Sequence, residues 1–116
     1  MQNRLVYITA GSMDEARKIG RALVAERLVA CVNLIDGMRS IYRWQGAIEE
    51  GSEVVVIAKT TAGRVGAVVE RVTALHSYTV PCVVAVPIES GNPEFMKWIA
   101  RETASAVPSD PDQSAA

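Results

Sequence analysis

The segment that most constrains the fold is residues 40–61, which reads SIYRWQGAIEEGSEVVVIAKTT. Its apolar run VVVIA is typical of a buried strand, and Glu50-Gly51-Ser52 ahead of that run is a turn signal. The run ACVNLI upstream is a second strand, and Asp36-Gly37 after it indicates either a tight hairpin or a bulge inside a longer strand. Because the stronger strand follows the turn at 50–52, we favour the bulge. The sequence thus predicts one long bent strand over residues 31–48, paired as a hairpin with residues 53–60.

The first part of the chain predicts a strand and a helix. Residues 4–10, RLVYITA, are apolar and β-branched, which indicates a buried strand. Ser12 with Glu15 three residues later forms a capping box at a helix start. The apolar positions that follow repeat with helical spacing: Ala16, Ile19, Gly20 and Leu23. We therefore expect an amphipathic helix that packs on a sheet.

The second half predicts a helix, a strand and a short last helix. Val65, Val68, Val69, Val72 and Leu75 share one helical face, which predicts a helix over about residues 62–75. Residues 82–87, CVVAVP, form a further strand that ends at its proline. Asn92 as N-cap and Pro93 as first helical residue begin the last helix.

These elements follow one another as strand, helix, strand, strand, helix, strand and short helix. That order predicts an α+β fold, a ferredoxin-like split βαβ sandwich with a long bent β-hairpin and a short C-terminal helix. Residues 1–104 would form this single domain, and the proline-rich, polar residues 105–116 a disordered C-terminal tail. Both helices would cover one face of an antiparallel sheet, so we expect another subunit to cover the other face.

The hairpin carries two aromatic residues that would point to the same side. On a strand, Tyr42 and Trp44 share one face, and Ile41 and Arg43 share the other. A hairpin this long projects beyond a small sheet, and such an apolar arm is an aggregation hazard when left in water. Tyr, Trp and Arg are enriched in protein interfaces, so we expect the arm to pack on a neighbouring copy.

Charge and composition exclude several classes of function. Of 116 residues, 22% are charged, the net charge is −1, and Lys and Arg are scattered, which argues against nucleic-acid binding. No apolar stretch approaches the ~20 residues of a membrane span, and we expect no signal peptide. Cys31 and Cys82 should be reduced thiols of a cytoplasmic protein. No nucleophile–base pair or phosphate-binding glycine motif is present, so we expect no enzyme.

Three motifs together resemble the CutA family of divalent-cation tolerance proteins: ACVNLIDGMRSIYRWQGAIEEGSEVVVIAKT, LHSYTVP and VPIESGNPEFMKWI. The resemblance runs from about residue 5 to residue 99. It implies a ferredoxin-like fold, a cytoplasmic homotrimer similar to the PII signalling proteins, and weak binding of copper or another divalent metal ion, with no obligatory cofactor. The chain departs from the family where copper ligands are proposed: Leu75 stands in place of the first of two histidines, and the first strand lacks a cysteine.

The candidate metal ligands are His76 and Cys82. Imidazole and thiolate suit copper and zinc, but His76 would also be favourable as a cation at a helix end, and Cys82 as a small buried strand residue. A second set of residues could line a cleft between subunits or simply pack the trimer: Tyr42, Arg43, Trp44, Glu53, Lys59, Tyr78 and Trp98.

Two other functions stay open at this point. One is a PII-like regulatory module that holds a small anionic ligand in the inter-subunit cleft, where Lys59 and the following helix N-terminus would favour an anion. The other is an enzyme, which only analogy with other ferredoxin-like proteins supports.

Overall fold

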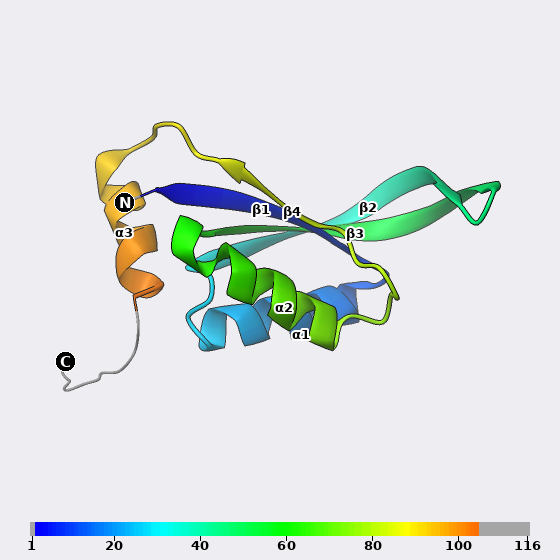
Figure 1. Ribbon diagram of the computed structural model, residues 1–116, viewed down its shortest axis with the longest axis horizontal. Helices are drawn as coiled ribbons and strands as arrows, with labels where there is room; N and C mark the ends of the chain where they lie inside the picture. The colour runs from blue at the N-terminus through cyan, green and yellow to red at the C-terminus, as the bar shows by residue number, and fades with distance from the viewer. Residues whose placement is uncertain (1, 105–116) are drawn as a thin grey trace.

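The computed structural model describes residues 2–104 (Figure 1). The elements follow the predicted order: β1 (Asn3–Ala10), α1 (Met13–Ala25), β2 (Cys31–Trp44), β3 (Ala47–Thr61), the 3₁₀ turn η1 (Ala62–Arg64), α2 (Val65–Leu75), β4 (Val83–Pro87) and α3 (Pro93–Glu102). The predicted disordered tail, residues 105–116, lies outside the described residues.

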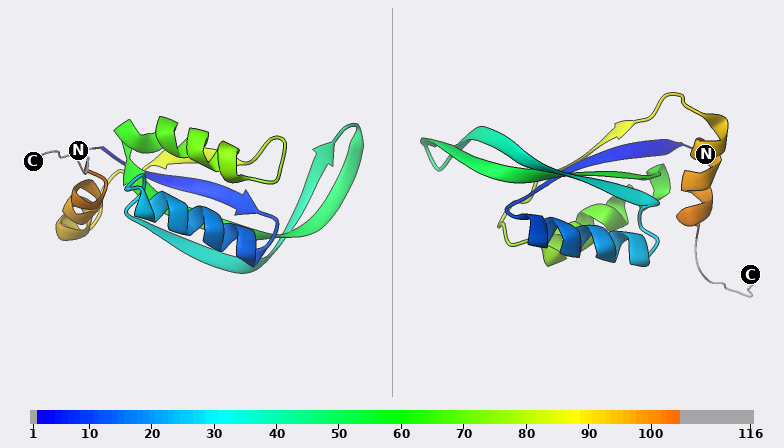
Figure 2. Two further views of the ribbon diagram at one scale, coloured as in Figure 1. Left: turned by 90° about the horizontal axis from the view of Figure 1, so that it is seen from below. Right: turned by 180° about the vertical axis from the view of Figure 1, so that it is seen from behind.

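The four strands form one antiparallel sheet in the order β2-β3-β1-β4. Helices α1 and α2 lie side by side on one face of this sheet, and α3 lies at the end remote from the hairpin (Figures 1 and 2). The predicted ferredoxin-like class is therefore confirmed. Between helices and sheet lies a core of fully buried aliphatic side chains: Val6, Ile8, Ile19, Leu23, Val56, Val68 and Val72.

Both predicted helix caps are present. The Ser12 hydroxyl accepts a hydrogen bond from the Glu15 N–H at 3.1 Å, and the Asn92 side chain accepts one from the Glu94 N–H at 3.0 Å. These bonds satisfy N–H groups that have no partner inside the helix.

The bulge at Asp36-Gly37 is confirmed. Ile35 pairs with Val55 and Met38 pairs with Glu53, so two residues of β2 lie opposite one residue of β3. Gly37 has a φ of 81°, a conformation that costs glycine little because it has no Cβ. The extra residue shifts the alternation along β2 by one position. Met38, Ser40 and Tyr42 consequently share the sheet face of Val55, the face turned away from the helices.

The predicted turn at Glu50-Gly51-Ser52 is wrong. These residues lie within β3, where Gly51 pairs with Ser40, and β2 ends at Trp44 rather than at residue 48. The chain reverses at Gln45 and Gly46, whose φ values are 50° and 83°. A two-residue turn with both φ values positive matches the twist of the paired strands. Closing the hairpin there extends the pairing, which offsets the roughly 1 kcal/mol cost of a left-handed Gln.

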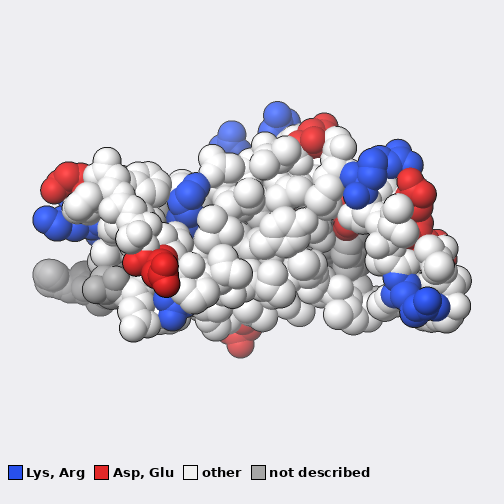
Figure 3. Space-filling model, turned by 90° about the horizontal axis from the view of Figure 1, so that it is seen from above, with Lys and Arg blue, Asp and Glu red and all other residues white. Residues whose placement is uncertain are grey.

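One face of the sheet has no cover from the helices. Ile35, Val84 and Val86 on this face are 50%, 53% and 49% exposed. Figure 3 looks onto the side opposite α1 and α2 and shows few charged side chains across the middle, with most at the two ends. This apolar surface is what the sequence predicted would need a neighbouring subunit.

The cysteines lie toward opposite edges of the sheet, as expected from the strand order. Cys31 begins the edge strand β2 and Cys82 directly precedes the other edge strand, β4. Both are free.

The bulge and the corrected turn make opposite predictions for two glycines. Gly37→Val should destabilise the protein by about 1–3 kcal/mol, because a β-branched residue is strained at positive φ. Gly51→Val should be neutral or stabilising, because Gly51 lies in a strand and a Cβ added there would have no other atom within 4 Å. Urea unfolding at matched protein concentration measures both. A large loss of stability in Gly51→Val together with little change in Gly37→Val would contradict this description and support a turn at Gly51.

Candidate functional site

A cavity of about 780 Å³ lies between the β2–β3 hairpin and the loop that joins α2 to β4. We call it the hairpin cleft. Five of the predicted site residues line it: Tyr42, Trp44, Glu53, Tyr78 and Cys82. His76, Arg43, Lys59 and Trp98 do not.

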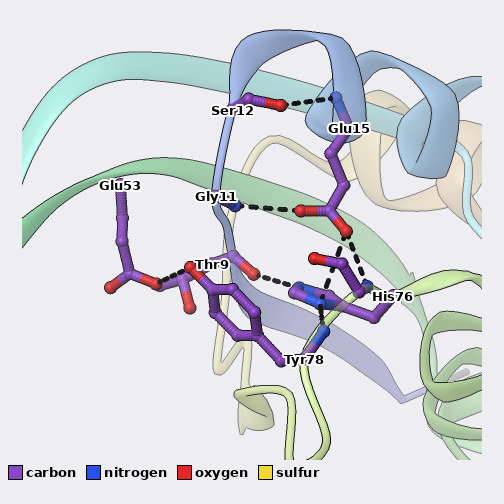
Figure 4. Close-up of polar contacts among 8 residues, drawn as sticks. Thr9, Gly11, Ser12, Glu15, Glu53, His76 and Tyr78 are labelled. Carbon is purple, nitrogen blue, oxygen red and sulfur yellow. Dashed lines mark hydrogen bonds and ion pairs between the residues drawn. The ribbon is translucent and has the colours of Figure 1, made fainter.

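Glu53 is fixed inside the cleft by two hydroxyl groups. Tyr78 Oη donates to Glu53 Oε2 at 2.8 Å (Figure 4), and Ser40 Oγ donates to Oε1 at 2.6 Å. Burial raises the pKa of Tyr78 to about 12, and the hydrogen bond to the Glu53 carboxylate acts in the same direction. Tyr78 therefore stays protonated at neutral pH and remains a donor.

His76 supports the loop that carries Tyr78. Its Nδ1 accepts a hydrogen bond from the Tyr78 N–H at 3.0 Å, which puts the ring proton on Nε2, and Nε2 donates to the Thr9 carbonyl at 2.7 Å. The side chain has no exposed surface, and its ring lies 4.4 Å from that of Tyr78, centroid to centroid. With both nitrogens bonded within the chain, the geometry favours a supporting role over a ligand role.

Glu15 holds the same loop from the first turn of α1. Its carboxylate accepts a hydrogen bond from the Gly11 N–H at 3.0 Å (Figure 4) and another from the Ser77 N–H at 2.7 Å. Burial alone would raise the pKa of Glu15, but these N–H donors outweigh it and hold the pKa below its ordinary value. The sequence indicated Glu15 only as a capping residue, because the contact with Ser77 spans 62 positions.

Cys82 is the sulfur-bearing candidate ligand inside the cleft. Burial raises the pKa of its thiol, and the negative charge of Glu53 adds to this rise. The thiol is therefore protonated at neutral pH, and a metal ion would have to displace that proton.

The remaining predicted cleft residues lie elsewhere in the chain. Lys59 Nζ donates to Asn33 Oδ1 at 2.6 Å on the uncovered sheet face. Arg43 is exposed on the hairpin. Trp98 stacks near Phe95 on α3, with ring centroids 5.4 Å apart, at the opposite end of the molecule (Figure 1).

The described residues of one chain do not make up a complete metal site. Across residues 2–104, no three His, Cys, Asp or Glu side chains are grouped so that they could hold a metal ion. A stable copper or zinc site normally uses three or four ligands. Any metal bound through Cys82 would need ligands from other residue types, water or another subunit.

The model of the CutA1 divalent ion tolerance protein family matches residues 4–102. This chain belongs to that family. The divalent-cation tolerance protein CutA of Thermus thermophilus is 50% identical over 99 residues, which cover 85% of this chain and 96% of that protein. The resemblance seen in the sequence is therefore confirmed.

Solved structures of family members have the same fold. The structure of the divalent cation tolerance protein from Thermus thermophilus is 48% identical with a TM-score of 0.86, over 88% of this chain and 99% of that one. The CutA structure from Archaeoglobus fulgidus, described as periplasmic, is 40% identical with a TM-score of 0.85, over 87% of this chain and 98% of that one. Within the described residues, no helix is long and apolar enough to cross a membrane. A cytoplasmic location stays a prediction.

Glu15→Gln should destabilise the protein by about 1–2 kcal/mol at pH 7, because two N–H groups lose a charged acceptor. Folding lowers the pKa of the Glu15 carboxyl from its ordinary value of 4.5. The ionised group therefore stabilises the folded state fully at pH values above 4.5, and this stabilisation is lost as the pH falls through the pKa of the folded state. The difference in the free energy of unfolding between wild type and Glu15→Gln, measured with urea, should thus be smaller at pH 3.5 than at pH 7.

Asp14→Asn is the matched control for Glu15→Gln. Asp14 lies exposed on the same helical turn, so its variant should lose only a dipole contribution of about 0.5 kcal/mol. Equal losses of unfolding free energy in the two variants would show that the hydrogen bonds from Gly11 and Ser77 to Glu15 do not stabilise the loop.

Proposed function

We propose that the chain acts in the cytoplasm as a homotrimeric divalent-cation tolerance protein that binds copper or a related ion weakly at the hairpin cleft. The observation that carries this proposal is the position of Cys82 and Glu53 in one cleft, next to a large apolar surface without cover. A thiol and a carboxylate in the same cavity supply part of a ligand set, and assembly would supply the rest. No catalytic step is part of this function.

The trimer is supported by the exposed apolar surface. Val84, Val86 and Ile35 lie on the uncovered sheet face and are 53%, 49% and 50% exposed. On the other face of the projecting hairpin, Ile41 and Ile48 are 70% and 71% exposed. Exposed apolar side chains gathered on a sheet face mark an interaction site.

Metal binding is supported by the chemistry of the cleft. Cys82 offers a sulfur ligand in the same cavity as the Glu53 carboxylate. A sulfur ligand favours copper and zinc over magnesium and calcium. His76 would have to release the Tyr78 N–H before it could bind a metal ion, so Cys82 is the stronger of the two predicted ligands.

An anionic ligand has less support at this cleft. Lys59, the cation expected to hold an anion, is bonded to Asn33 and does not line the cavity. Arg39 does line it, but its guanidinium is paired with the Glu50 carboxylate at 3.4 Å. The PII-like alternative therefore has no free cation among the described cleft residues.

Light scattering of the full chain at low micromolar concentration should report three times the chain mass of 12.5 kDa. Val84→Asp should dissociate the trimer, because a carboxylate would be buried in the interface. Val24→Asp places the same group on α1, on the opposite side of the sheet, and should leave the mass unchanged. A monomeric wild type would overturn the assembly.

Copper(II) titration calorimetry should show binding that strengthens with pH. Because the Cys82 thiol must lose its proton, affinity should rise by up to about tenfold per pH unit between pH 6.0 and pH 7.5. Cys82→Ser should weaken binding by at least about tenfold, and Cys31→Ser should not. The same titrations with zinc(II), which does not oxidise thiols, separate binding from oxidation of the thiol by copper(II).

His76→Ala tests the second predicted ligand in the same titration. A loss equal to that of Cys82→Ser would make His76 a ligand, whereas an affinity near wild type would leave it with its role in the loop. Unchanged binding in both variants would contradict a metal site at the cleft.

A further inference from the structure

The bulge in β2 leaves one Asp-Gly peptide outside the strand pairing. The register between β2 and β3 stops at Ile35 and resumes at Met38, so neither Asp36 nor Gly37 has a paired partner. Both residues are exposed. An Asp-Gly peptide inside a paired strand is held extended by the neighbouring strand, whereas the residues of a bulge are free of that constraint.

The Asp36 carboxyl is folded onto the backbone nitrogen of the next residue. The Gly37 N–H donates to Asp36 Oδ1 at 2.8 Å, and because Cγ is bonded to Oδ1, this contact also brings Cγ toward the nitrogen. The approach of the two atoms is open, because Gly37 has no side chain and a Cβ built there would have no atom of a non-adjacent residue within 4 Å. A carboxyl carbon and an amide nitrogen in this arrangement are the two atoms that a succinimide ring joins.

This carboxyl does not belong to the surface that assembly would bury. Ile35 lies on the sheet face that the proposed trimer covers, and strand alternation puts Asp36 on the other side. The residue opposite the bulge, Val54, is correspondingly part of the core under the helices. The site uses neither Cys82 nor Glu53 and is therefore independent of metal binding in the hairpin cleft.

We propose that Asp36-Gly37 is a site of spontaneous backbone isomerisation. In the first step a bond forms between the Gly37 nitrogen and Asp36 Cγ, the Cγ hydroxyl leaves with the amide proton as water, and a succinimide ring closes. In the second step water attacks the backbone carbonyl carbon of Asp36, the bond from that carbon to the Gly37 nitrogen breaks, and the main chain then runs through Cβ and Cγ as isoaspartate. Attack of water at Cγ instead restores aspartate, and neither step needs an oxidant or a cofactor.

Isomerisation would lengthen β2 at the position that sets its alternation. Isoaspartate inserts one extra carbon atom into the main chain and leaves the former backbone carbonyl of Asp36 as a free carboxylate. The hydrogen bond from Ser40 to Glu53 at 2.6 Å depends on the present register beyond the bulge. We therefore expect the isomerised protein to unfold at a lower urea concentration than the intact protein.

Ageing of the full-length protein tests the proposal directly. The assembled protein is kept with EDTA at neutral pH and physiological temperature for several weeks, and samples are digested with trypsin. The tryptic peptide of residues 28–39 contains Asp36-Gly37. Its isoaspartyl form separates on reversed-phase chromatography at unchanged mass, and its succinimide form is lighter by one water molecule. A synthetic peptide of the same sequence is aged in parallel.

Isoaspartate should accumulate in the protein at a rate within about tenfold of the rate in the free peptide, because the bulge reacts without opening of the hairpin. If ring closure required the hairpin to open first, the rate would fall by the equilibrium constant for that opening. A larger reduction than tenfold relative to the free peptide, whether from the fold or from assembly, would overturn the proposal.

Glu50→Asp provides a matched control within the same hairpin. It places an aspartate before Gly51, which pairs with Ser40, so the same dipeptide is then held inside the paired part of β3. Isoaspartate should form at position 50 at least about tenfold more slowly than at Asp36. Equal rates at the two positions would contradict a role for the bulge.

Asp36→Glu separates isomerisation from other damage during ageing. It keeps the negative charge, but its carboxyl would have to close a larger ring, so no isomerised product should be detected. The fall in the urea midpoint during ageing should appear in wild type and be absent in Asp36→Glu. Equal falls in the two proteins would place the damage elsewhere in the chain and contradict the expected effect on the hairpin.

Discussion

The single extra residue at Asp36-Gly37 decides which side chains reach the cleft. Strand side chains alternate, so a bulge exchanges the two faces for everything beyond it. With the bulge, Met38 follows Ile35 on the face turned away from the helices, and Ser40 and Tyr42 continue along that face. Ser40 can then bond Glu53, and Tyr7 can donate its hydroxyl to Met38 Sδ at 3.3 Å. In regular pairing, Arg39 and Ile41 would occupy the strand positions of Ser40 and Tyr42, and the hydrogen bond between Ser40 and Glu53 would be lost.

The opposite wall of the cleft is held by groups that lie far apart in sequence. Glu15 at the start of α1 fixes Ser77, and the Thr9 carbonyl at the end of β1 fixes His76. His76 in turn holds the Tyr78 N–H, and Tyr78 bonds Glu53 on β3. One connected network of hydrogen bonds thus joins α1, β1, the α2–β4 loop and the hairpin.

Much of the fold could be predicted because it depends on local patterns. Ser12, Asn92 and the apolar spacing of α1 act within a few residues, and the sequence indicated all of them. The hairpin turn could not be placed in this way, because Gly46 and Gly51 are equally plausible as turn residues locally. What separates them is the pairing of β2 with β3 over their full length, which is a property of the sheet.

The site was predictable only in part, for a similar reason. Tyr42, Trp44 and Glu53 come together because they lie on one hairpin, and the alternation of a strand indicates which of them share a side. Lys59 and Trp98 were expected nearby on the strength of residue type alone, and residue type does not specify distance. His76 was singled out as a ligand because it is the only histidine, whereas the Thr9 carbonyl and the Tyr78 N–H already bond both of its nitrogens.

The strand order also has a consequence for the order of folding events. The β2–β3 hairpin pairs residues as near in sequence as Trp44 and Ala47, so its loop-closure entropy is small. Strand β4 joins β1 through pairs such as Arg4 with Pro87, and contacts of such wide separation form slowly. We therefore expect the hairpin to be among the first structures to form and β4 to dock among the last. Because the loop before β4 carries Tyr78 and Cys82, the cleft would exist only once nearly the entire chain has folded.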